Sequence, residues 1–198
     1  MYSQCPYCNS FSKIDFEKRT FVFNPVMYSD GYEHKTNSDQ LKIVLCPNSS
    51  CNKFFKISGQ YSVNQIEDES IDSSQRTILI KDRDYDIKGL LELLEKEELT
   101  DFELDIRKHL LWELNDLIRE DEKADLPIEL ADIDVHNKKR LVELLRHKTE
   151  QKDLLLLAEI YRELGEFSNC ELIITGIKKI NPKYKSITNG IYYKSRLK

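Results

Sequence analysis

The sequence predicts an α+β protein in which a small β-rich head is joined to an all-α, repeat-like body. Two observations carry this prediction. Residues 1–80 hold short runs of aromatic and β-branched side chains together with two pairs of cysteines. From residue 86 onward, leucine and other apolar residues recur at steps of three and four, which is typical of helices. We therefore expect two domains, residues 1–80 and residues 81–198.

Four short runs in the head have the composition of strands. They are rich in Phe, Ile, Val and Leu and cover residues 19–23, 41–45, 53–57 and 76–80. Residues 64–75 are polar and have no helical period, so they are expected to form a connector.

The cysteines form a C-x2-C pair and a C-x4-C pair with 37 residues between them. The N-terminus has neither the basic start nor the apolar segment of a secretory signal, so we expect reduced thiols in the cytoplasm. Four thiolates on two short loops can surround Zn²⁺ as a tetrahedron and leave no position for substrate. We predict one structural zinc ion bound by Cys5, Cys8, Cys46 and Cys51.

Proline follows the first cysteine of each pair, and Asn9 and Asn52 follow the second. This arrangement resembles the zinc ribbon family, whose knuckles typically read Cys-Pro-x-Cys-Gly. Asn in place of Gly and the two extra residues of the second knuckle depart from that pattern without removing a ligand. Asn tolerates the left-handed backbone conformation that such a turn needs.

A rival interpretation starts from Cys5-Pro-Tyr-Cys8, which is also the active-site tetrapeptide of glutaredoxins. In that family a buried strand precedes the motif and a helix begins at its first cysteine. Only four residues precede Cys5, and Cys46 and Cys51 would have no role, so we favour zinc. His34 is the substitute ligand if one cysteine pair is not a knuckle.

The body is expected to contain several helices. Apolar residues at positions 90, 91 and 94, and then at 102, 106, 110, 114 and 117, predict two of them. Thr100 and Glu103 match a capping box at the start of the second, and Pro127 is expected to close this region. Trp112 shares a helix with these leucines and is expected in the core. We expect helical layers over residues 101–122 and 135–148 and a closing helix over 183–198.

One 34-residue unit near the C-terminus resembles a tetratricopeptide repeat. Large, small and turn residues fall at the positions that this family uses, and Cys170 stands where the repeat usually has Ala, at a close helix crossing. A plain helical bundle explains the same period. The matching residues are Leu154, Leu157, Ala158, Tyr161, Gly165, Phe167, Cys170, Ile174, Ile177 and Pro182.

Charge is distributed unevenly along the chain. The net charge is −1 over residues 1–80, −11 over 81–134 and +7 over 135–198. Solvated faces or mutual attraction of the two helical segments is the simpler explanation. Alternatively, the acidic residues 92–103 and 120–122 dock a basic protein partner. The last 23 residues hold seven Lys or Arg beside Tyr184, Tyr192 and Tyr193, a pattern that also suits nucleic acid.

We find no sequence motif of a metalloprotease, α/β-hydrolase, P-loop or zinc deaminase, so we expect no enzyme. His109, His136 and His147 have no ligand spacing. No apolar run approaches the length of a membrane span, which excludes a membrane partner. The preferred function is protein binding, as an adaptor or as an inhibitor such as an immunity protein. The alternative is a nucleic-acid-associated factor that uses the zinc ribbon and the basic C-terminal helix.

Overall fold

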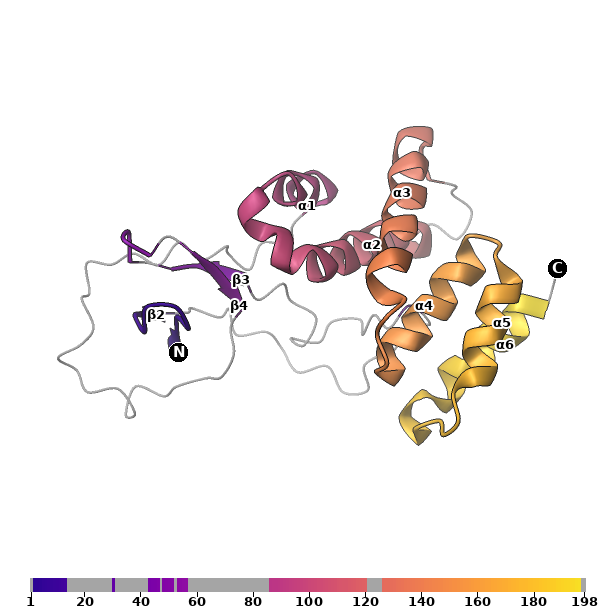
Figure 1. Cartoon of the computed structure of the whole chain (residues 1–198). Coiled ribbons are helices and arrows are strands. Elements are labelled where there is room, and N and C mark those ends of the chain that lie inside the picture. Colours follow the sequence, from indigo (N-terminus) through magenta and orange to yellow (C-terminus); the bar gives the residue numbers. More distant parts are fainter. Residues whose placement is uncertain are drawn as a thin grey trace. The chain divides into compact units, whose positions relative to one another are not determined.

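The computed structural model describes residues 2–13, 30, 43–46, 48–51, 53–56, 86–120 and 126–196 (Figure 1). Most of these residues are helical. The chain divides into two compact units, one made of Met1–Thr20 and Gln40–Glu103, the other of Phe21–Asp39 and Leu104–Lys198. Several predictions lie outside the described residues: the strands at 19–23 and 76–80, the connector at 64–75, the domain boundary after residue 80, and His34.

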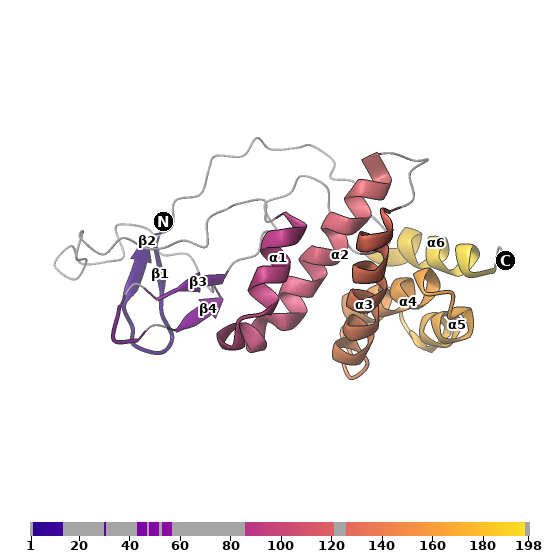
Figure 2. The same cartoon turned by 90° about the horizontal axis from the view of Figure 1, so that it is seen from above.

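The described part of the head consists of two antiparallel hairpins (Figure 2). In the first, β1 (Tyr2–Gln4) pairs with β2 (Phe11–Lys13), and in the second, β3 (Ile43–Leu45) pairs with β4 (Phe54–Lys56). The second hairpin falls within two of the predicted strands. The first was not predicted, because three-residue strands are too short to show an alternating pattern.

Helix α1 (Ile87–Leu94) begins at Asp86, whose carboxylate accepts a hydrogen bond of 2.8 Å from the backbone N–H of Gly89. A 3₁₀ helix, η4 (Glu97–Phe102), follows and leads into α2 (Glu103–Glu120). The predicted capping box is therefore wrong. Thr100 lies inside η4, and its hydroxyl donates to the carbonyl of Glu97 at 2.7 Å instead of capping the next helix.

Helix α3 (Ile128–Leu145) starts directly after Pro127, whose carbonyl accepts hydrogen bonds from the N–H groups of Leu130 and Ala131. The predicted range of 135–148 was thus seven residues late at its start and three too long at its end. Proline stands comfortably at a helix start because the first turn needs no donor there, so Pro127 opens a helix as well as closing the region before it.

Helices α2, α3 and α4 (Gln151–Glu163) enclose one apolar cluster, made of Leu111, Leu141, Leu145, Leu156, Leu157 and Ile160.

Polar side chains also connect helices α2, α3 and α4. The amide of Asn137, which is 1% exposed, donates to the carbonyl of Arg107 at 3.0 Å and accepts from its guanidinium at 3.3 Å. Lys108 donates to Asp153 at 2.8 Å. This ion pair joins a lysine of the acidic segment to an aspartate of the basic one, whereas Lys138 of the basic segment pairs with Asp134 of the acidic one.

The C-terminal hairpin has helices at the predicted positions, α4 and α5 (Phe167–Gly176) (Figure 2). Gly165 ends the first helix with a φ of +76°, a left-handed conformation that glycine adopts without strain. Ala158 of α4 and Cys170 of α5 are both fully buried in one cluster with Leu155, Ile174 and Ile191. Cys170 therefore has the core position that the sequence predicted.

A short 3₁₀ helix, η5 (Pro182–Tyr184), precedes α6 (Lys185–Arg196), which packs on α4 and α5. Asn181 begins this region by accepting a hydrogen bond of 3.0 Å from the N–H of Lys183. None of the helices in the described ranges is both long and apolar enough to cross a membrane.

Candidate metal centre

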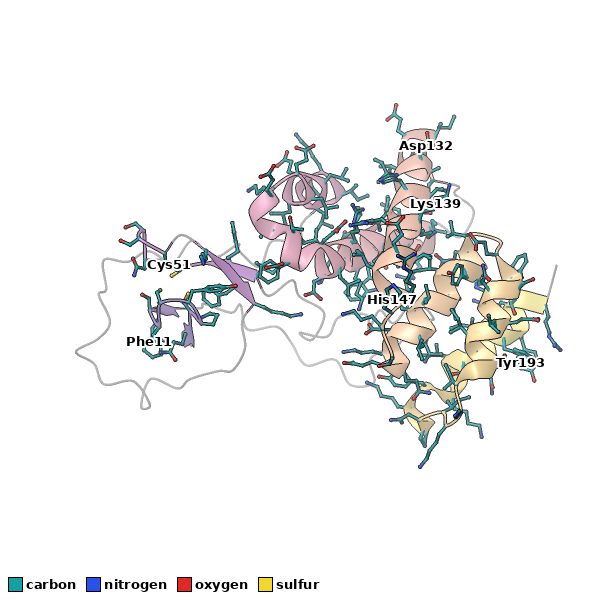
Figure 3. The ribbon with its side chains drawn as sticks, in the orientation of Figure 1. Phe11, Cys51, Asp132, Lys139, His147 and Tyr193 are labelled. Carbon is teal, nitrogen blue, oxygen red and sulfur yellow. The ribbon has the colours of Figure 1, made fainter. Side chains whose placement is uncertain are left out.

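The four predicted cysteines lie together. The sulfur atoms of Cys5, Cys8, Cys46 and Cys51 are all within 4.8 Å of one another, and no other group of three or more potential ligands of this kind occurs among the described residues. Cys5 and Cys46 are buried, whereas Cys8 and Cys51 are half-buried at the edge of the head. Figure 3 shows Cys51 on the loop between β3 and β4.

The spacing of the sulfurs fits a tetrahedral zinc ion. A Zn–S bond of about 2.3 Å places two sulfurs of a tetrahedron about 3.8 Å apart. The Sγ atoms of Cys8 and Cys46 are 3.4 Å apart and those of Cys5 and Cys51 are 3.9 Å apart. Both distances join one loop to the other, so the two loops bring their cysteine sulfurs to a common point. These separations also exclude disulfide bonds, which need an S–S length of about 2 Å.

Backbone hydrogen bonds fold the first knuckle between β1 and β2. The N–H of Cys5 donates to the carbonyl of Ser10 at 2.8 Å, and the N–H of Asn9 donates to the carbonyl of Cys5 at 2.9 Å. Asn9 has a φ of +63°, the left-handed conformation predicted from its place after the second cysteine. Its counterpart, Asn52, lies outside the described residues.

The second knuckle is a wider turn that accommodates its two extra residues. The N–H of Cys46 donates to the carbonyl of Lys53, and the N–H of Cys51 donates to that of Asn48, both at 2.9 Å. The side chain of Asn48 accepts from the N–H of Ser50 at 3.0 Å and stiffens the insertion. The longer loop therefore still returns Cys51 to the centre.

Ser10 is a residue of the site that the sequence did not predict. Its hydroxyl oxygen lies 3.2 Å from the sulfur of Cys8 and accepts a hydrogen bond of 3.4 Å from the side chain of Asn48. Hydrogen bonds from the side chain and backbone of Ser10 lower the pKa of the Cys8 thiol to about 6. Ser10 thus stabilises a thiolate, the form that binds metal, and connects it to the opposite knuckle.

Burial has the opposite effect on the thiol pKa of two other cysteines. It raises the pKa of the Cys46 thiol and that of Cys51. A buried thiolate without a counter-charge is unfavourable, and a divalent cation among the four sulfurs supplies that charge. The donor set therefore suits a metal ion better than free thiols.

A buried phenylalanine ring and a cation–π contact accompany the cysteine cluster. The ring of Phe55, 1% exposed, packs against Cys5 and Cys46. The ammonium group of Lys53 lies 4.8 Å from the ring centre of Tyr7, a cation–π contact between the two knuckles. The thiol-redox alternative has no structural support here, because Cys5 is followed by a turn and strand β2, not by the start of a helix.

The described histidines and Trp112 do not form a second cluster of potential ligands within the part of the chain that the structure describes. His109 packs edge-on against Trp112 at 4.8 Å, and His136 and His147 are exposed. Trp112 is half-buried and donates from its indole N–H to the backbone carbonyl of Asp30 at 3.3 Å, so it serves packing and hydrogen bonding together.

The acidic residues at 92, 95, 97 and 101 are exposed beside a small hollow of about 190 Å³. Leu93, Leu94, Lys96, Leu99, Thr100 and Glu103 line this hollow. The side chains of residues 120–122, the second acidic candidate, lie outside the description. Tyr184 and Tyr192 of the basic segment pack against the core, whereas Tyr193 is 66% exposed.

No family model, curated protein or solved structure matches this chain.

Proposed function

We propose that the chain is a zinc-stabilised binding protein without catalytic activity. Cys5, Cys8, Cys46 and Cys51 hold one structural Zn²⁺ in a zinc-ribbon-like head, and the helices, of the tetratricopeptide type, bind a protein partner as an adaptor or inhibitor. The observation that carries the metal assignment is the close approach of all four sulfurs. Four thiolate ligands complete the coordination of zinc, so the ion acts in folding rather than as a Lewis acid.

Partner binding rests on the surface of the helices. Ile128, Leu172 and Tyr193 are 84%, 72% and 66% exposed, although large apolar side chains usually avoid water. Helical hairpins of this kind present rigid side chains to other proteins. The alternative, a nucleic-acid-associated factor, is favoured by the exposed lysines near the C-terminus and by the exposed ring of Tyr193.

Purification of the tagged chain from its native cells tests the proposal. Elemental analysis should give one zinc per chain, and X-ray absorption should give Zn–S distances of about 2.3 Å. Cys170→Ala is the matched control, since this fifth cysteine is buried away from the cluster and should leave the zinc content unchanged. A protein should co-elute in a stable ratio. Co-elution of nucleic acid without protein would support the alternative, and absence of zinc would refute the metal assignment.

A further inference from the structure

The segment from α5 to α6 concentrates unpaired positive charge. Lys178 and Lys179 follow α5, Lys185 begins α6, and Lys194 lies near its end; all four are exposed. None of the four ammonium groups makes a hydrogen bond or ion pair in the described structure. The only carboxylate between Phe167 and Arg196 is that of Glu171, and it accepts a hydrogen bond of 3.2 Å from Arg196. No carboxylate of this segment pairs with Lys178, Lys179, Lys185 or Lys194 in the described structure.

Two cations elsewhere in the helices are instead paired with carboxylates. Lys138 lies within 3.0 Å of two carboxylates, those of Asp134 and Glu163. Arg162 donates two hydrogen bonds to Glu159, at 2.7 and 3.0 Å. Lys138 and Arg162 thus serve internal packing, whereas Lys178, Lys179, Lys185 and Lys194 face solvent.

Exposed apolar side chains lie on the same two helices. Leu172 of α5 and Tyr193 of α6 are 72% and 66% exposed, while Ile174 and Ile191, two residues away on each helix, are in the core. Because two residues correspond to about 200° of helical rotation, Leu172 and Tyr193 point away from that core. Figure 3 shows Tyr193 at the outer surface of these helices.

We infer that α5, α6 and the four exposed lysines Lys178, Lys179, Lys185 and Lys194 form the docking surface for an acidic, amphipathic segment of a protein partner. This inference rests on the proposed binding function and specifies its surface. Carboxylates of the partner would face the lysines, and its apolar side chains would cover Leu172 and Tyr193. Charge complementarity of this kind raises the association rate and selects the partner, while the apolar contacts slow dissociation.

An acidic segment of a protein fits this surface better than a nucleic acid or a second copy of the chain does. Tyr184 and Tyr192 pack on the core, so most of the aromatic rings are not free to stack on bases. Leu172 has no role against a phosphate backbone, and the net charge of −5 repels nucleic acid as a whole. A second copy of the chain that docked through the same face would place lysines against lysines.

The test measures the affinity of the full-length, zinc-loaded chain for two labelled peptides of equal length and charge. One contains glutamate with leucine at i, i+3, i+4 and i+7, and the other contains glutamate spaced by serine. An oligothymidine of similar charge is the third probe. The chain should bind the leucine-bearing peptide at least tenfold more tightly than the other two, with an affinity that falls as salt rises.

Two triple variants with the same net charge separate the surface from overall electrostatics. The first reverses three lysines of the segment: K178E/K179E/K185E. The second reverses three exposed lysines elsewhere that also lack ion pairs: K96E/K139E/K148E. The first should lose at least tenfold in affinity for the acidic peptide, and the second no more than about twofold. L172S/Y193S should remove the preference for the leucine-bearing peptide. Far-UV circular dichroism checks that each variant is folded. K178Q/K179Q/K185Q is a milder variant, because it removes the three positive charges without reversing them.

Equal losses in the two triple variants would overturn the inference, as would oligothymidine binding as tightly as the peptide. Self-association of the chain at low salt that K178E/K179E/K185E abolishes would identify a second copy as the occupant instead. The proposed function can be judged separately. If a protein co-purifies with the wild type and equally with K178E/K179E/K185E, the binding function stands and this surface assignment is wrong.

Discussion

Asn115 donates a hydrogen bond of 2.7 Å to the buried carboxylate of Asp30, although 85 residues separate the two. The guanidinium of Arg119 donates to the same carboxylate oxygen, and the indole of Trp112 donates to the backbone carbonyl. Three successive turns of α2 therefore hold one aspartate from the stretch between the two cysteine pairs. Asp30 is 2% exposed, so these contacts are shielded from solvent.

Asp30→Ala should destabilise the helical unit by about 2–3 kcal/mol, because it removes the buried carboxylate that accepts hydrogen bonds from Arg119 and Asn115. Urea unfolding followed by circular dichroism measures this change. Asp116→Ala is the control: Asp116 also accepts from Arg119, at 2.6 Å, but its side chain is 28% exposed. Its loss should cost less than about 1 kcal/mol. Equal effects of the two variants would show that Asp30 contributes no more than a surface ion pair.

Cys46→Ser should prevent stoichiometric zinc binding and unfold the head, while the helices from α2 to α6 stay formed. Structural zinc stabilises small folds by about 10 kcal/mol or more. Among the described residues of the head, the buried apolar side chains besides the cysteines are Phe55 and Ile43. Far-UV circular dichroism should keep most of its helical signal, while amide resonances of residues 2–13 collapse to random-coil positions. A parallel loss of helix would show that the helices depend on the head.

Lys138→Met should cost about 3 kcal/mol or more, because Asp134 and Glu163 would both remain buried without their shared cation. Lys139→Met, one residue further along α3, removes the same charge from an exposed position (Figure 3) and should change stability by less than about 0.5 kcal/mol. Chemical denaturation of both variants checks the difference. Similar stabilities would mean that the α3–α4 charge cluster is not strongly desolvated.

The charge cluster of Lys138, Asp134 and Glu163 predicts that the free energy of unfolding depends on pH. Burial raises the pKa of Glu163, and the attraction of Lys138 offsets this only in part. Burial alone would lower the pKa of Lys138, but the charges of Glu163 and Asp134 outweigh it and raise that pKa. Glu159, also buried, and Arg162 complete the set of charges around Glu163.

The folded protein therefore holds a proton on Glu163 more tightly than the unfolded chain does, where the pKa is 4.5. The contribution of Glu163 to the unfolding free energy should rise as pH falls through the folded pKa toward 4.5. Glu163→Gln cannot take up this proton, so the wild type should gain stability relative to the variant over that range. Glu143→Gln, at a side chain 56% exposed, is the control. Both variants keep the same cysteine cluster, so acid release of metal cancels in the comparison. A difference that stays constant with pH would contradict the expectation.

Gly165→Ala should destabilise the turn between α4 and α5 by about 1–2 kcal/mol, since its φ of +76° is unfavourable for any side chain. No atom lies within 4 Å of the added methyl group, so the cost is backbone strain alone. Gly176→Ala, at the end of α5 with ordinary backbone and equally open space, should be neutral or stabilise slightly. Thermal melts of the two variants should therefore shift differently, and equal shifts would refute the assignment of strain.

The sequence by itself determined which four cysteines of the head come together, the left-handed Asn9 and the helical hairpin around Cys170. Cysteine spacing, turn residues and helical period are local signals, and each of these features depends on residues within a few positions of one another. The sequence misplaced the start of α3 and the cap at Thr100, because a proline or a hydroxyl can serve more than one local structure and packing selects among them.

Tertiary structure alone decided which distant side chains meet. Ser10 meets Asn48, Asp30 meets α2, and Lys138 meets Glu163, and each contact joins residues far apart in the sequence, so nothing in their immediate sequence marks it. It also decided that Tyr184 and Tyr192 lie against the core while Tyr193 faces solvent. The physical reason is that burial and hydrogen bonding depend on how elements pack, whereas composition and period describe one element at a time.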